Sequence, residues 1–205
     1  MTNEKAMNAG QFLRDVASHG MTVKLDNGLY RHLLFRAATD SWCMWFEIVT
    51  WPGSLAIHGD MGTWEFSRTQ DMFGFFRNRE LTINASYWHE KISSESRFGG
   101  PAKKFDAAVY RSSVISALDN YELTDPEKAE IVAALEEEVF QEEDESTARR
   151  ALCDFKHHDF RFTDEWEING QGYSYHFLWC LHAIVWAIQQ YDAARSPAAP
   201  TVLSA

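Results

Sequence analysis

The 205-residue chain has few of the features that mark secreted or disulfide-stabilised proteins. It contains three cysteines, Cys43, Cys153 and Cys180, none of them in a C-x-x-C pair, and five prolines. Its first ten residues are polar and lack the apolar segment of a secretion signal. Free thiols without a secretion signal are typical of a reducing compartment. We therefore expect a cytoplasmic protein without disulfide bonds.

No apolar run is long enough to cross a membrane. The longest, residues 173–188, is interrupted by Ser174, His176 and His182, whereas a membrane-spanning helix needs about 20 apolar residues. We expect residues 175–194 to form a helix that is apolar on nearly all sides and runs through the core of the protein. We expect no association with a membrane.

Motifs of nucleotide-binding and nucleophile-based enzymes are also missing. The chain has no G-x-x-x-x-G-K phosphate loop, no G-x-G-x-x-G after a predicted strand, and no G-x-S-x-G nucleophile elbow. These absences remove the usual sequence grounds for predicting a nucleotide-binding enzyme or a serine hydrolase. We predict no cofactor, and an enzyme is the less favoured class.

What the chain does contain is an unusually aromatic set of core residues. Hydrophobic residues make up 45% of it, with 14 Phe, 8 Trp and 7 Tyr, enough to build a substantial core. Short extended segments joined by turn residues predict an antiparallel β-meander over residues 21–67. Helical periodicity follows from residue 69 onward.

These patterns predict an α+β fold in which the N-terminal antiparallel β-meander packs against a mostly helical second half. We expect a single domain over residues 1–195, with residues 196–205 as a flexible tail. The expected strands are 21–25, 29–36, 42–51, 54–58 and 63–67. The expected helices are 9–18, 69–77 with Thr69 as N-cap, 85–93 with Asn84 as N-cap, 102–121 opened by Pro101, 128–141 after a Thr124–Glu127 capping box, 146–155 and 175–194.

Charge is distributed very unevenly along the chain, whose net charge is −11. Residues 119–145 hold 12 acidic residues and one lysine, so the remaining 18 acidic and 18 basic residues balance. The most closely spaced acids place negative charge along about 15 Å of a predicted helix, at ~1.5 Å per residue. DNA carries about one charge per 1.7 Å of its axis, so this segment can imitate a track of phosphates. The predicted partner-binding residues are Glu136, Glu137, Glu138, Glu142, Glu143, Asp144 and Glu145. The alternative is an ordinary solvated face beside the apolar stripe of the same helix.

Several runs of residues are distinctive enough to compare with a known family. They are Gly28-Leu-Tyr-Arg-His-Leu-Leu-Phe35, Trp45-Phe-Glu-Ile-Val-Thr-Trp-Pro-Gly53, His58-Gly-Asp-Met-Gly62, Phe66-Ser-Arg68, Asp71-Met-Phe-Gly-Phe-Phe-Arg77, Ile83-Asn-Ala-Ser-Tyr-Trp-His-Glu-Lys91, His158-Asp-Phe160 and Phe177-Leu-Trp-Cys-Leu-His-Ala-Ile-Val-Trp186. Together they resemble a family of bacteriophage and prophage proteins without an established activity. The resemblance covers nearly the whole chain and is weakest over residues 119–145. It implies a mobile-element protein that acts in the cytoplasm of a bacterial host.

Two classes of function follow from the charge and the resemblance. The first is a protein that binds and inhibits a host nucleic-acid-processing or defence complex, in the manner of an anti-CRISPR protein or an acidic mimic of DNA. Its partner would be a host protein or nucleoprotein complex with a basic surface, since an acidic field repels nucleic acid itself. The second is a small phage enzyme or ligand-binding protein with a site around His58 and Asp60, and His158 as a further member.

Each candidate site residue also has a structural interpretation. Asp60 lies between Gly59 and Gly62, where glycines allow close approach of a ligand but equally suit a tight hairpin turn. His157, His158 and Asp159 are possible metal ligands, as are His176 and Cys180, which lie four residues apart on the last predicted helix. Their spacing matches no familiar zinc signature, so the sequence predicts no metal site, and the question stays open.

Overall fold

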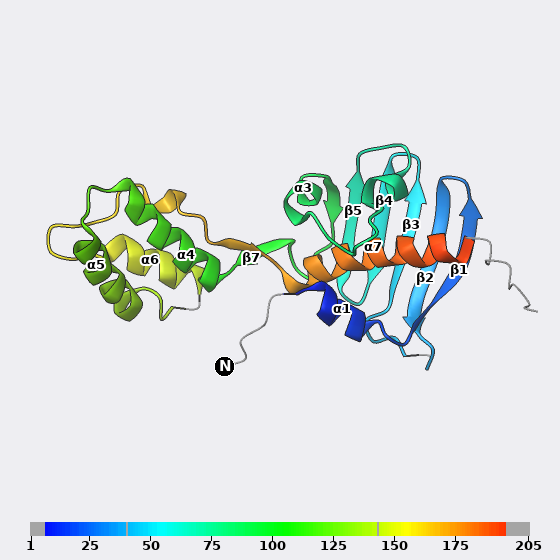
Figure 1. Cartoon of the computed structure of the whole chain (residues 1–205), viewed down its shortest axis with the longest axis horizontal. Helices are drawn as coiled ribbons and strands as arrows, with labels where there is room; N and C mark the ends of the chain where they lie inside the picture. Colours follow the sequence, from blue (N-terminus) through cyan, green and yellow to red (C-terminus); the bar gives the residue numbers. More distant parts are fainter. Residues whose placement is uncertain (1–6, 40, 143, 196–205) are drawn as a thin grey trace, which may run out of the picture. The chain divides into compact units, whose positions relative to one another are not determined.

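The computed structural model describes residues 7–39, 41–142 and 144–195 (Figure 1). The chain groups into two compact units: unit 1 comprises residues 1–102 and 173–205, and unit 2 comprises residues 103–172. Each unit has its own cluster of buried hydrophobic residues. Residues 1–195, which we expected to form one domain, thus contain two separately packed cores. The tail expected at residues 196–205 lies outside the described residues.

Six antiparallel strands form the sheet of unit 1, and each pairs with its neighbour in sequence. They are β1 (His19–Asn27), β2 (Tyr30–Ala37), β3 (Phe46–Trp51), β4 (Ser54–Gly59), β5 (Gly62–Ser67) and β6 (Ile92–Glu95). The predicted meander over residues 21–67 is confirmed. Strand β6 was missed because its four residues include one apolar side chain, Ile92, and so lack the alternation that marks a half-buried strand.

Four helices accompany this sheet: α1 (Ala9–Asp15), α2 (Met72–Phe76), α3 (Ala85–His89) and α7 (Tyr175–Arg195). Figure 1 shows α7 lying across the strands, and it contacts both β1 and β5. The helix carries twelve buried residues, among them Phe177 and Trp179 at 0% exposure. The predicted core helix over 175–194 is confirmed. No helix in the described part of the chain is long and apolar enough to cross a membrane.

Two helix starts in unit 1 test the capping predictions. Asn84 caps α3, accepting a hydrogen bond from the Tyr87 amide at 3.2 Å, as predicted. Helix α2, however, is capped by Asp71, which accepts from the Phe73 amide at 3.0 Å, so the prediction of Thr69 is wrong. A carboxylate is as good an N-cap as a hydroxyl, and Asp71 lies two residues closer to the apolar run.

Unit 2 is built from three helices, α4 (Ala107–Ala117), α5 (Asp125–Glu138) and α6 (Glu145–Asp154). The 3₁₀ turns η1 (Leu118–Asn120) and η2 (Glu165–Glu167) and the paired strands β7 (Lys103–Phe105) and β8 (Gln171–Tyr173) complete the segment. The predicted helix start at residue 102 is wrong. Asp106 caps α4 by accepting from the Ala108 and Val109 amides, so the helix begins five residues later. The capping box of α5, between Thr124 and Glu127, is confirmed.

The chain leaves unit 1 after residue 102 and returns to it at residue 173, and these two points lie next to each other. The amide of Ser174 donates a hydrogen bond to the carbonyl oxygen of Ala102 at 2.9 Å, and both residues belong to unit 1. Residues 103–172 are therefore an insertion between two backbone positions that already contact each other.

Candidate functional sites

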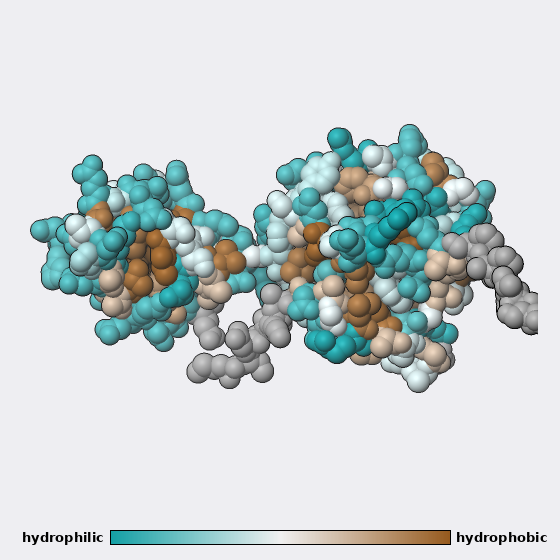
Figure 2. Space-filling view, in the orientation of Figure 1, coloured by the Kyte–Doolittle hydropathy of each residue, from teal (hydrophilic) through white to brown (hydrophobic). Residues whose placement is uncertain are grey.

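The net charge of the protein belongs almost entirely to the inserted unit. Residues 103–172 contain 18 acidic and 8 basic residues, a net charge of −10, whereas the rest of the chain has 12 acidic and 11 basic residues, a net charge of −1. Figure 2 shows hydrophilic residues over most of the visible surface of unit 2, around a smaller apolar area. The acidic excess therefore coincides with one structural unit.

The acidic residues of this unit do not form one continuous helical row. Helix α5 ends at Glu138 with Val139 as its C-cap, three residues before the predicted end at Gln141. The side chain of Gln141 donates to the carbonyl oxygen of Glu136 at 2.8 Å and satisfies one of the acceptors left at the helix end. The following residues turn into α6, so the predicted acids are divided between a helix end, a turn and a helix start.

Three of the seven predicted acids have partners within unit 2. The carboxylate of Glu136 accepts from Nε of Arg111 at 2.8 Å, and Glu145 accepts from Nε of Arg149 at 3.0 Å. Asp144 caps the N-terminus of α6, where a serine hydroxyl and backbone amides of the first turn hold the pKa of its carboxyl below the usual range. These acids contribute to the negative field but also help to hold the unit together.

Three of the remaining acids are free to meet another molecule. Glu137, Glu138 and Glu142 are exposed, and no hydrogen-bond or ion-pair partner for them is found among the described residues. Glu143 lies outside the described residues. The exposed acids are therefore the part of the predicted partner-binding set that is most available for binding.

The loop around Asp60 has a structural role. One carboxylate oxygen of Asp60 accepts from the Met44 amide at 2.9 Å, and the Asp60 amide donates to the Trp45 carbonyl at 3.0 Å. Nδ1 of His58 lies 2.8 Å from Oγ1 of Thr63. His58 and Asp60 therefore each bond a different residue. Asp60 fixes the segment before β3, where Met44 has a positive φ of 56°.

Among the described residues, His176 and Cys180 on α7 belong to no group of three possible metal ligands. Nδ1 of His176 lies 2.9 Å from the carbonyl oxygen of Gly99. Burial raises the pKa of the Cys180 thiol well above its usual value, which opposes the thiolate form that binds metals. Cys180 is thus a buried core residue. His158 belongs to unit 2, whereas His58 and Asp60 belong to unit 1.

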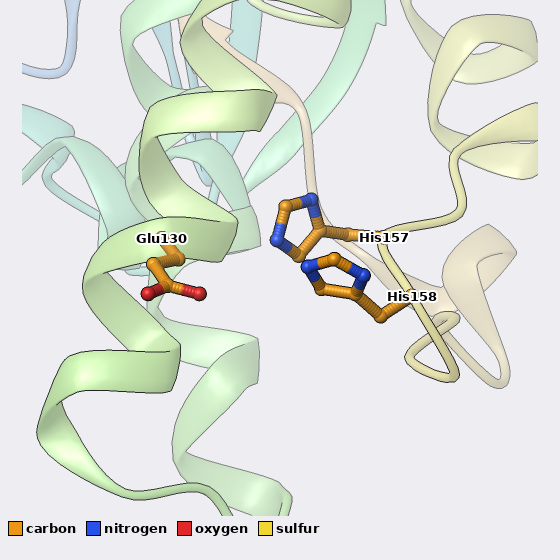
Figure 3. A group of neighbouring side chains, drawn as sticks. All are labelled: Glu130, His157 and His158. Atoms are coloured by element: carbon orange, nitrogen blue, oxygen red, sulfur yellow. The ribbon is translucent and has the colours of Figure 1, made fainter.

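One group of possible metal ligands does occur within the described residues. It consists of Glu130 from α5 and His157 and His158 from the segment after α6, with one ligand atom of each within 4.8 Å of the others (Figure 3). The two imidazole ring centroids lie 4.4 Å apart, and the rings are inclined at 67°. Figure 3 shows both rings facing the helix that carries Glu130.

A tight turn presents the two histidines. His157 and Phe160 exchange backbone hydrogen bonds of 3.1 and 2.9 Å across the turn. His158, the first residue inside it, has a φ of 52°, a left-handed conformation that is uncommon for residues other than glycine, although histidine, asparagine and aspartate adopt it more often than the rest. Such conformations cost free energy and persist where the surrounding structure enforces them.

The histidine pair opens onto a cavity of about 430 Å³. Glu122, Glu127 and Asp159 line it together with the candidate ligands, and none of the described lysines or arginines does. Hydrogen bonds from the Thr124 hydroxyl and amide hold the pKa of Glu127 below its usual value, which keeps that group charged. The cavity therefore favours a cation.

His157 is the most enclosed member of this group. Its Nε2 atom is buried and has no hydrogen-bond partner in the part of the chain that the structure describes. Leaving a buried polar atom without a partner costs about 1–3 kcal/mol. Both histidines are candidates from the sequence alone, but Glu130 is not, because it lies 27 residues before His157 in a helix where acids are common.

No protein-family model, no curated protein and no solved structure matches this chain.

Proposed function

We propose that this chain is a phage or mobile-element protein that binds and inhibits a nucleic-acid-processing or defence complex in the bacterial cytoplasm, such as a CRISPR effector complex. The observation that carries the proposal is the concentration of charge: unit 2 has a net charge of −10 and the rest of the chain −1. An inserted unit with this charge can act as a docking element while the sheet unit serves as its support.

The negative charge of unit 2 acts on the rate of encounter with a partner more than on the final affinity. A compact negative field attracts a basic surface over a distance of about 8–10 Å at physiological salt, the Debye length. Steering of this kind raises association rates by about 10- to 1,000-fold and weakens as ionic strength rises. The same field repels nucleic acid, so the partner is the basic channel of a protein or nucleoprotein rather than DNA or RNA.

The exposed acids identify which residues to change first. Glu137, Glu138 and Glu142 are exposed, whereas Ile131 and Leu135 of the same segment are buried, so charge reversal at the three acids leaves the core intact. Because the acids follow a bent path, mimicry of DNA would rest on the density of charge and not on a regular helical spacing.

The experiment measures target-DNA binding by purified, guide-loaded CRISPR effector complexes as the protein is added. We expect inhibition that saturates near one protein per binding site, and an association rate that falls steeply with salt. The variant Glu137→Lys/Glu138→Lys/Glu142→Lys should associate at least tenfold more slowly at low salt, within the range of electrostatic steering.

A matched control distinguishes an effect of where the reversed acids lie from an effect of the net charge of the protein. The variant Glu80→Lys/Glu90→Lys reverses two exposed acids of unit 1 and is compared with Glu137→Lys/Glu138→Lys, so the net charge changes equally. It should inhibit nearly as well as the wild type. If both variants lose inhibition equally, net charge alone matters and the docking element is not in this segment. If neither variant loses it, the acidic segment is not the binding surface.

The alternative function, an enzyme or ligand-binding protein around His58 and Asp60, has weaker support. The Asp60 carboxylate is engaged by the Met44 amide. Asp60→Ala should therefore lower stability modestly and leave inhibition unchanged, whereas loss of an activity in a folded Asp60→Ala protein would favour the alternative.

A further inference from the structure

We propose that Glu130, His157 and His158 bind a divalent transition-metal ion of the zinc class. Two imidazoles and one carboxylate are the ligand set of many three-ligand zinc sites, in which water takes the fourth position. The three ligand atoms already lie within 4.8 Å of one another, and they come from two segments that the fold of unit 2 brings together. The site is separate from the acidic docking residues and does not depend on the proposed function.

The geometry needs only small adjustments to hold the ion. Zinc bonds of about 2.0–2.2 Å in a tetrahedron place neighbouring ligand atoms about 3.4 Å apart. The largest movement is therefore on the order of 1 Å, relative to the present 4.8 Å limit. Glu130 and His158 are exposed and can change rotamer, while the paired backbone of the turn keeps His157 in place.

The unpartnered nitrogen of His157 distinguishes this group from an ordinary acidic patch. Nε2 of His157 is buried and has no hydrogen-bond partner among the described residues, so a metal ion would supply its missing interaction. Two adjacent imidazoles facing the same cavity present neutral nitrogen ligands, which suit zinc, copper, nickel and iron better than calcium or magnesium.

The charge of the surrounding residues also favours a metal cation at this site. Three further acidic residues, Glu122, Glu127 and Asp159, line the cavity, and no lysine or arginine in the described part of the chain does. Their field lowers the free energy of a cation there and discourages anions. The left-handed backbone of His158 directs the second imidazole into the group at a conformational cost, as at other binding sites where local strain is retained.

The test uses the untagged 205-residue chain, because a histidine tag would bind the metal itself. After removal of metals with a chelator, Zn²⁺ is titrated by calorimetry, with Mg²⁺ as the comparison ion. We expect one Zn²⁺ per chain and much weaker binding of Mg²⁺. With Co²⁺ as a probe, absorption in the visible range should show the intense bands of a four-coordinate site.

Three variants assign the ligands. His157→Ala, Glu130→Gln and His158→Asn should each weaken Zn²⁺ binding at least 100-fold, since even outer-shell partners are worth about 10- to 100-fold. Asparagine at 158 tolerates the left-handed conformation, so this variant keeps the turn while removing the imidazole. Circular dichroism confirms that each variant is folded.

Two matched controls keep the result specific. Glu137→Gln alters an exposed acid on the same helix α5, and His58→Ala removes an exposed histidine from unit 1. Both should bind Zn²⁺ like the wild type. The proposal is overturned if the wild type binds no stoichiometric Zn²⁺, or if the folded His157→Ala and His158→Asn variants bind it as tightly as the controls do.

Discussion

Unit 1 and unit 2 differ in the size of their cores and in their charge. Unit 1 packs aromatic rings between a sheet and a long helix, with the Trp179 ring 5.1 Å from that of Phe12 and 5.6 Å from that of Phe46. Unit 2 packs aliphatic residues such as Leu135 and Leu152 together with aromatic residues such as Phe155 and Phe162, in a smaller core beneath many charged surface residues. The near-neutral unit has the larger core, and the inserted unit carries the charge and the histidine group.

The largest expected effect is in the aromatic core of unit 1. Trp179→Ala removes a fully buried ring whose Nε1 donates to Asp15 at 3.1 Å. The change should cost about 3–5 kcal/mol of unfolding free energy. Hydrogen exchange measured by mass spectrometry should show faster exchange in unit 1 and little change in unit 2. Trp166→Ala, at an exposed position in unit 2, is the control; uniform loss of protection in both units would contradict their independence.

A converse change should destabilise unit 2 alone. Leu135 is fully buried in the core of unit 2, and Leu135→Ala should cost about 2–5 kcal/mol. Exchange should then accelerate over residues 107–154 while α7 and the sheet keep their protection. Ala133→Ser, at an exposed position on the same helix, should have a much smaller effect.

An ion pair in unit 1 gives an intermediate effect with a defined pH dependence. Arg31 donates to Asp71 at 2.8 Å and lies over the Phe73 ring at 4.5 Å. Burial by itself would raise the pKa of Asp71, but the hydrogen bond and charge of Arg31 outweigh it, so the pKa is lowered from 3.8. Stability from this pair is fully present above the unfolded pKa and is lost as pH falls below about 4 toward the folded pKa.

Asp71→Asn tests this pair while keeping a residue that can cap α2. Because the Asp71 side chain is 39% exposed, solvent screens the pair and the cost should be about 1–2 kcal/mol at pH 7. The difference from wild type should shrink at acidic pH, as measured by urea denaturation between pH 2 and 7. A difference that grows as pH falls would contradict the assignment.

The smallest effect on the fold of unit 1 is expected from removing the insertion altogether. Because Ser174 bonds to the carbonyl of Ala102, a short Gly-Ser linker can replace residues 103–172. The shortened protein should retain the folded core of unit 1, monitored by near-ultraviolet circular dichroism of its tryptophans, and should lose binding of any basic partner. Failure to fold would mean that unit 1 requires unit 2.

Some helices and strands of this chain follow from local sequence signals, and others do not. Turn residues such as Asn27 and Gly28 located the hairpins, and the capping box at Thr124 located α5, because these signals are local. Strand β6 was missed because it depends on pairing with β5. The start of α4 was missed because the helix begins after the cap Asp106 and not at Pro101.

The candidate sites also divide into one that is visible in the sequence and others that depend on tertiary contacts. The acidic segment was visible in the sequence because charge density along a chain needs no knowledge of its folding. The role of Asp60 in holding the Met44 amide depends on two loops meeting, and the approach of Glu130 to His157 depends on α5 packing beside the segment after α6. Neither contact has a sequence spacing of its own.

The sequence by itself determined the α+β class, the meander, the core helix α7 and the location of the net charge, because periodicity, turn chemistry and composition act over a few residues. The tertiary structure alone decided that the second half divides into a core helix and an inserted helical unit, and which histidines meet a carboxylate. Those outcomes depend on which apolar faces pack together over long sequence separations, and patterns within short windows do not encode that choice.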